Sequence, residues 1–148
     1  MGTLLLLMAL LIGGCFPPIN PPVPPTPIPD PLHPIPAAGF RVLIVYDSTA
    51  PITAEQLGAM NGTKLAELLN TKCVKTASGL PEWRVWDQAT IDEAGLSDES
   101  EVWRTIWGVA VPQLTKLPAV VIVVGNKTRV LSLPATEAET LKLIRDAQ

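Results

Sequence analysis

The chain has 148 residues, of which 47% are hydrophobic, and its formal net charge at pH 7 is −3. Acidic and basic residues are interspersed without a basic stripe, which excludes the electrostatic footprint of a nucleic-acid-binding domain. The single histidine, His33, has no cysteine or second histidine nearby. We therefore expect no metal, and no motif in the chain points to another cofactor.

The chain begins with a short apolar run over residues 4–12, followed by Gly13-Gly14-Cys15. About 13 helical residues at ~1.5 Å each span roughly 20 Å, which is short of a ~30 Å bilayer core but typical of a secretory signal. The junction resembles the lipobox of bacterial lipoproteins. This resemblance implies that residues 1–14 are a signal peptide, that Cys15 carries a lipid anchor, and that the protein is held in the cell envelope, at the outer membrane or on the periplasmic face. No Lys or Arg precedes the run, which departs from that pattern; an uncleaved signal anchor and a cytosolic chain with an apolar start are the alternatives.

Residues 15–39 form a linker that contains eleven prolines between Pro17 and Pro36. Proline has no N–H for a strand ladder and drives its predecessor into extended conformations, so we expect a polyproline-II strut reaching on the order of 60 Å. The alternative is a ligand for proline-binding modules. Such ligands usually carry a nearby cation, and none occurs before Arg41, which favours the spacer.

A folded domain is expected over residues 40–148, with its elements in a legible order. Residues 42–46 predict a strand buried on both faces. The loop of residues 47–51 follows, and Thr53 with Gln56 predicts a capping box that opens a helix, with a break at Asn61-Gly62. The apolar residues expected to face the core along this stretch are Leu57, Met60, Leu65, Leu68 and Leu69.

The second half of the domain alternates in the same way. Residues 83–86 predict a strand and residues 98–114 a helix, on which Trp103 and Trp107 lie one turn apart. Tryptophans in this arrangement are more often core residues, but a binding surface is the alternative. Residues 119–124 predict the strongest strand, followed by a turn at 125–127 and a returning strand at 128–131. Thr136 and Glu139 predict a capping box for a last helix, with Leu141 and Ile144 inward.

The predicted fold class is therefore α/β, in the order β-α-β-α-β-β-α, with a parallel first pair and an antiparallel closing hairpin. This order, together with Leu117-Pro118-Ala119 at the start of the strongest strand, resembles the thioredoxin core. The resemblance implies that Pro118 is cis and faces the loop after the first strand. The binding loop would then comprise Asp47, Ser48 and Thr49, opposite Leu117 and Pro118.

The sequence departs from the thioredoxin pattern at the point where the chemistry should reside. The loop contains no Cys-x-x-Cys, and Cys73 lies some twenty residues further on as the one cysteine left if Cys15 carries lipid. Dithiol exchange needs two thiols, and Ser48 has no histidine in the domain to act as its base. We therefore expect a non-catalytic, membrane-tethered domain that binds a protein or peptide. The alternative is an atypical redox protein that acts through a free thiol at Cys73.

Overall fold

The computed structural model describes residues 38–91 and 93–147, and the figures show how their helices and strands are arranged. The predicted signal peptide, the lipid-bearing Cys15 and the proline-rich linker up to residue 37 lie outside the described residues.

A four-stranded mixed sheet in the order β2-β1-β3-β4 forms the centre of the domain. Its strands are β1 (Phe40–Tyr46), β2 (Trp83–Asp87), β3 (Ala119–Val124) and β4 (Lys127–Ser132). Strand β1 is parallel to β2 and antiparallel to β3, and β3 and β4 form an antiparallel hairpin. The predicted α/β class, the parallel first pair and the antiparallel hairpin are confirmed.

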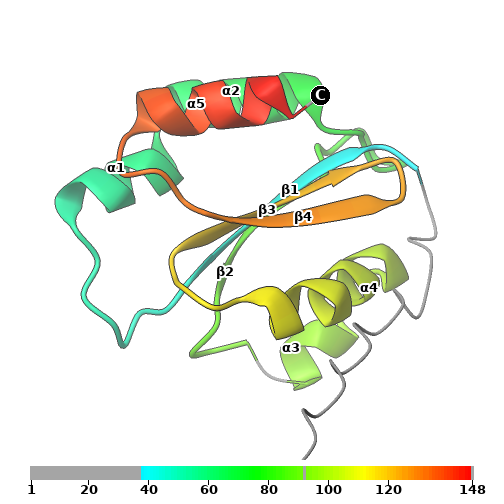
Figure 1. Cartoon of the computed structure of the whole chain (residues 1–148). Helices are drawn as coiled ribbons and strands as arrows, with labels where there is room; N and C mark the ends of the chain where they lie inside the picture. The colour runs from blue at the N-terminus through cyan, green and yellow to red at the C-terminus, as the bar shows by residue number, and fades with distance from the viewer. Residues whose placement is uncertain (1–37, 92, 148) are drawn as a thin grey trace, which may run out of the picture. The chain divides into compact units, whose positions relative to one another are not determined.

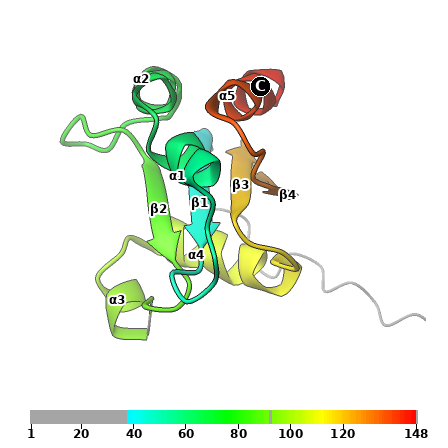
Figure 2. The same ribbon diagram turned by 90° about the vertical axis from the view of Figure 1, so that its left-hand side faces the viewer.

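Helices cover both faces of the sheet (Figures 1 and 2). One face carries α1 (Ala54–Asn61), α2 (Thr63–Lys72) and α5 (Glu137–Asp146), and the other carries α3 (Glu93–Ser97) and α4 (Glu101–Ala110), followed by a 3-10 turn (Val111–Gln113). Alternation along the central strands supplies both cores, because successive side chains point to opposite faces. Val42 and Ile44 are buried against α1, α2 and α5, whereas Leu43 and Val45 are buried on the α4 face.

The local signals in the sequence account for most element boundaries. Thr53 and Gln56 form the predicted reciprocal capping box of α1, and Gly62 separates α1 from α2. The predicted box of α5 forms only in part: Thr136 accepts the Glu139 N–H, but its hydroxyl donates to the Glu139 carboxylate. The hairpin turn consists of Gly125 and Asn126 alone, and the positive φ of Gly125 is the conformation that glycine supplies in two-residue turns.

Three expectations about the helices were wrong. The helix predicted over residues 98–114 begins only at Glu101, and its last turn, which contains Pro112, tightens into the 3-10 conformation. The short helix α3 was not predicted at all. Leu57, which was expected to face inward, is 45% exposed, because α1 is short and buries only Ala59 and Met60.

Candidate functional site

The loop after β1 is held by its own side chains. The Asp47 carboxylate accepts hydrogen bonds from the Thr49 N–H at 2.8 Å and from the Thr49 hydroxyl at 2.6 Å. The Ala50 N–H donates to the Asp47 carbonyl at 3.2 Å, so Asp47 closes a turn through both its side chain and its backbone. Ser48 and Thr49 are exposed at the tip of this turn.

A second carboxylate, that of Asp87, ties this loop to the end of β2. Its Oδ1 accepts from the Ser48 N–H and from the Ala89 N–H, both at 3.0 Å. Hydrogen bonds from the Ser48 side chain first, and then from the Ser48 and Ala89 N–H groups, hold the pKa of Asp87 below its usual range. Sequence reasoning missed Asp87. The signal that could have found it is its position, because parallel strands β1 and β2 end at the same edge of the sheet.

Leu117 and Pro118 lie beside the same loop. Val45 pairs with Ala119, so the two residues before β3 adjoin the end of β1, from which the Asp47 turn departs. The Leu117–Pro118 peptide bond is cis, as the resemblance to thioredoxin implied. Pro118 is buried, and its carbonyl accepts the Leu133 N–H at 3.0 Å. The structure thus brings together the two segments that the sequence singled out.

The backbone of Leu117 is available at this site. Among the described residues, neither its N–H nor its C=O takes part in a hydrogen bond, while its half-buried side chain packs on the α4 face. The N-terminus of α1 is closed in a different way: the Gln56 N–H donates to the Thr53 hydroxyl at 3.2 Å, and the Thr53 N–H donates to the Gln56 side chain at 3.0 Å. The groups left open beside the loop are therefore those of Leu117.

Cys73 lies far from this loop. It is the C-cap of α2, and the neighbouring Val74 N–H donates to Phe40, at the opposite end of β1 from Asp47. The thiol is free but only 4% exposed, and burial raises the pKa of Cys73 to about 11. A buried thiol with a raised pKa is a poor nucleophile, because the thiolate is the reactive form.

The interpretation of Trp103 as a surface aromatic was wrong. Trp103 is 1% exposed and faces the sheet, because it belongs to the buried stripe of α4 together with Ile106 and Ala110. Its indole N–H has no hydrogen-bond partner among the described residues. Trp107 is partly buried and packs edge-on against Trp86, with ring centroids 5.3 Å apart. The pair is core rather than a platform for a ligand.

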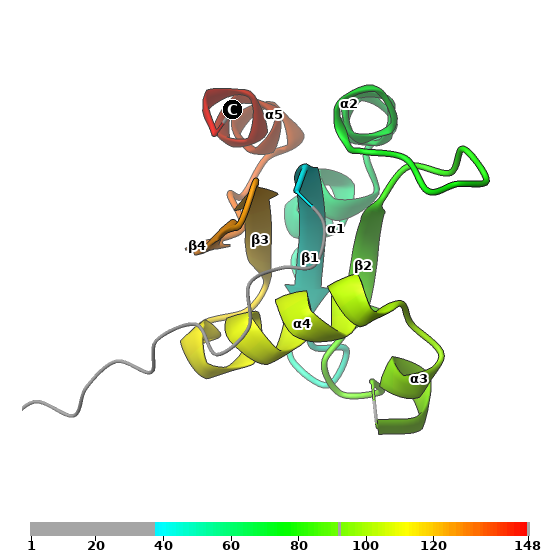
Figure 3. The same cartoon turned by 90° about the vertical axis from the view of Figure 1, so that its right-hand side faces the viewer.

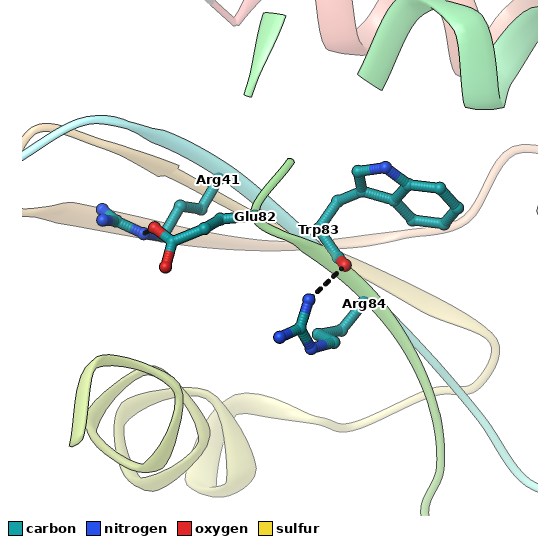
Figure 4. Close-up of polar contacts among 4 residues, drawn as sticks. All are labelled: Arg41, Glu82, Trp83 and Arg84. Carbon is teal, nitrogen blue, oxygen red and sulfur yellow. Dashed lines mark hydrogen bonds and ion pairs between the residues drawn. The ribbon is translucent and has the colours of Figure 1, made fainter. Parts of the chain in front are cut away.

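Charged groups are buried at the end of the sheet remote from the loop (Figure 4). Arg41 at the start of β1 and Glu82 before β2 form an ion pair at 2.6 Å, with side chains 4% and 12% exposed. The Arg84 guanidinium lies 5.1 Å from the centroid of the Trp103 ring and is paired with Glu99 at 3.3 Å. The sequence did not reveal these pairs, because each joins segments that only the strand register brings together. A buried pair of this kind specifies structure more readily than it performs chemistry.

The remaining surface offers little concavity. A shallow hollow of about 440 Å³ is lined by residues of α2 and α5, which do not include the Asp47 turn. Within residues 38–91 and 93–147, His, Cys, Asp and Glu side chains form no group of three that could hold a metal ion, and no helix is long and apolar enough to cross a membrane. Comparison with protein-family models, curated proteins and solved structures gives no significant match.

Proposed function

We propose that this chain is a membrane-tethered lipoprotein whose thioredoxin-like domain binds an extended peptide or protein segment without catalysing a reaction. The observation that carries the proposal is the juxtaposition of the Asp47–Thr49 turn with Leu117 and Pro118. It follows from a sheet order in which β1 has β2 parallel on one side and β3 antiparallel on the other. In the thioredoxin core, extended peptides bind beside this same proline.

The backbone at the site suits such a partner. The N–H and C=O of Leu117 are without partners among the described residues, so an extended segment can pair with them as a strand does. The turn opposite is braced by Asp47 and Asp87, so it presents Ser48 and Thr49 with little further loss of conformational entropy.

The alternative of a redox protein acting through Cys73 has less support. Its thiol is buried, its pKa is raised, and it lies at the other end of β1 from the exposed turn. A redox role would require α2 to move away from the sheet before the sulfur could meet a partner.

Photo-crosslinking in envelope fractions tests the binding proposal. The substitution Ser48→Trp places a bulky side chain on the exposed turn, and Ala77→Trp places the same side chain on an exposed loop that follows α2. We expect Ser48→Trp to abolish the specific adducts and Ala77→Trp to leave them in place. Identical adducts in both variants would show that the turn is not the binding site.

The tether is tested separately. Mass spectrometry of the mature N-terminus should find a lipid-modified Cys15, and Cys15→Ser should move the protein from the membrane fraction to the soluble fraction. An unmodified Cys15 with Met1 retained refutes the anchor and leaves the binding proposal to be judged on the crosslinking alone.

A further inference from the structure

The two edges of the sheet differ in how many backbone groups they leave unpaired. The residues of β2 alternate between facing β1 and facing outward, and Trp83 and Asp87 face outward. The Trp83 carbonyl accepts from the Arg84 guanidinium at 3.0 Å (Figure 4), and its N–H donates to the Pro81 carbonyl at 3.2 Å. The Asp87 carbonyl accepts two N–H groups of the turn that follows it. The β2 edge is therefore largely closed by its own neighbourhood.

The β4 edge is open. In a hairpin with a two-residue turn, the residues that flank the turn form a hydrogen-bonded pair, and such pairs alternate along the ladder. Val124 and Lys127 flank this turn, and the Leu133 N–H bonded to the Pro118 carbonyl lies in phase with them. The residues whose backbone groups point outward are therefore Thr128, Val130 and Ser132. Within the described part of the chain, no donor or acceptor meets any of these groups.

We propose that this edge pairs with the same edge of a second copy of the chain, in an antiparallel register centred on Val130. Val130 then lies opposite Val130 of the other copy, and Thr128 lies opposite Ser132. These are hydrogen-bonded positions, so each pair exchanges two N–H to C=O bonds across the two-fold axis. The two sheets become one continuous sheet. The view from the side shows β4 at the border of the sheet, with α4 below and α5 above it (Figure 3).

The charges on β4 select this register. Centring on Val130 places Arg129 opposite Leu131 of the other copy and Lys127 opposite Leu133, so no like charges face each other. A shift to a centre at Arg129 would put the two guanidinium groups directly opposite one another. A centre at Thr128 would oppose Lys127 and Arg129. Like charges on directly opposed strand positions are destabilising, so the cations exclude these alternatives.

This pairing is independent of the proposed peptide site, because it uses the outer edge of β4 and not the Asp47 turn. The partner is taken to be a second copy because the edge is complementary to itself in charge and in length. A strand from another protein would need no two-fold relation, and the cysteine experiment below separates the two cases.

The first test is the mass of the full chain, purified in detergent and measured by sedimentation over a range of concentrations. We expect a dimer. Val130→Pro removes the outward N–H at the centre and is tolerated on an edge strand. Because it deletes two of the bonds, it should weaken dimerisation roughly 30-fold. Val130→Lys, which places two cations opposite each other, should weaken it as well, whereas Val130→Thr keeps the N–H and should not.

The second test reads the register with single cysteines. Opposed residues in a hydrogen-bonded pair have Cα atoms about 5.5 Å apart, within the ~4.4–6.8 Å range of disulfides. Val130→Cys should therefore crosslink on mild oxidation. Thr128→Cys should not crosslink with itself, since its two copies lie ~14 Å apart along the strands, but should crosslink when mixed with Ser132→Cys. The unsubstituted chain, with Cys15 and Cys73, gives the background.

A monomer at every concentration would overturn the proposal, and so would a dimer whose stability Val130→Pro and Val130→Lys leave unchanged. Crosslinking of Arg129→Cys with itself, in place of Val130→Cys, would overturn the register.

Discussion

The N-terminus of α2 depends on a carboxylate from another helix, and removing it gives a sharp prediction. The N-cap of α2 is Gly62, which has no side chain to accept the first N–H groups. The Glu137 carboxylate, from the first turn of α5, accepts the Leu65 N–H at 3.0 Å instead. Glu137→Ala removes this bond and the favourable interaction of the charge with two helix N-termini.

The expected loss of stability follows from these contacts. Loss of an N-cap side chain costs about 1 kcal/mol, and loss of a charge at a helix N-terminus costs about 0.3–1 kcal/mol. Because Glu137 is only half-buried, solvent screens part of the effect, and we expect a total of about 1–2 kcal/mol. In a domain of this size, that loss lowers Tm by roughly 4–8 °C for each kcal/mol.

Urea denaturation followed by tryptophan fluorescence measures the free energy of unfolding. The matched control is Glu55→Ala, which removes an exposed carboxylate from the first turn of α1. Gly62→Ala should be destabilising on its own, because its Cβ would meet the Glu137 carboxylate, but less so when Glu137 is already alanine. If Glu137→Ala costs no more than Glu55→Ala, or if the Gly62 and Glu137 effects simply add, the capping argument is wrong.

Four further outcomes are expected. Gly39→Ala should destabilise the domain by about 1–3 kcal/mol in the same urea assay, since Gly39 has a φ of 151° and an added Cβ would meet a valine side chain. The Cys73 thiol, whose pKa is raised from 9.0 to about 11, should make stability fall as pH rises from 9 to 11, because only the unfolded state ionises there, and Cys73→Ala should flatten that fall. Trp103→Phe, which deletes an unpartnered buried N–H, should change stability by less than about 1 kcal/mol, whereas Trp103→Ala should cost about 3–5 kcal/mol. Asp87→Ala should accelerate hydrogen exchange at the Ser48 amide, and lowering the pH below 3.8 in the unsubstituted protein should have the same effect, because the carboxylate that accepts this N–H is then protonated.

Local patterns in the sequence predicted most of the elements. The β-branched runs predicted β1 and β3, and the Thr53 and Gln56 pair predicted the start of α1 to the residue. Each of these signals acts within a few residues, so it is readable without the rest of the fold. The start of α4 was predicted three residues early, because acidic residues near a helix start do not say which one caps it.

The candidate site was predicted only in part. The Asp47 turn and Leu117-Pro118 were identified from their places in the order of elements, and the structure brings them together. Asp87 was missed, because its bond to Ser48 depends on the register of β1 against β2. Trp103 was assigned an alternative surface role, because the stripe of α4 is broad and periodicity alone does not say which part of it meets the sheet.

The sequence by itself determined the α/β class, the order of the elements and the residues that cap α1, since these depend on backbone propensity and on neighbours along the chain. Only the tertiary structure decided that Glu137 caps α2, that Arg41 and Glu82 are buried together, and that one sheet edge is closed while the other is open. The physical reason is that these features join groups that lie 41 and 72 residues apart, or depend on which backbone groups a strand register leaves over.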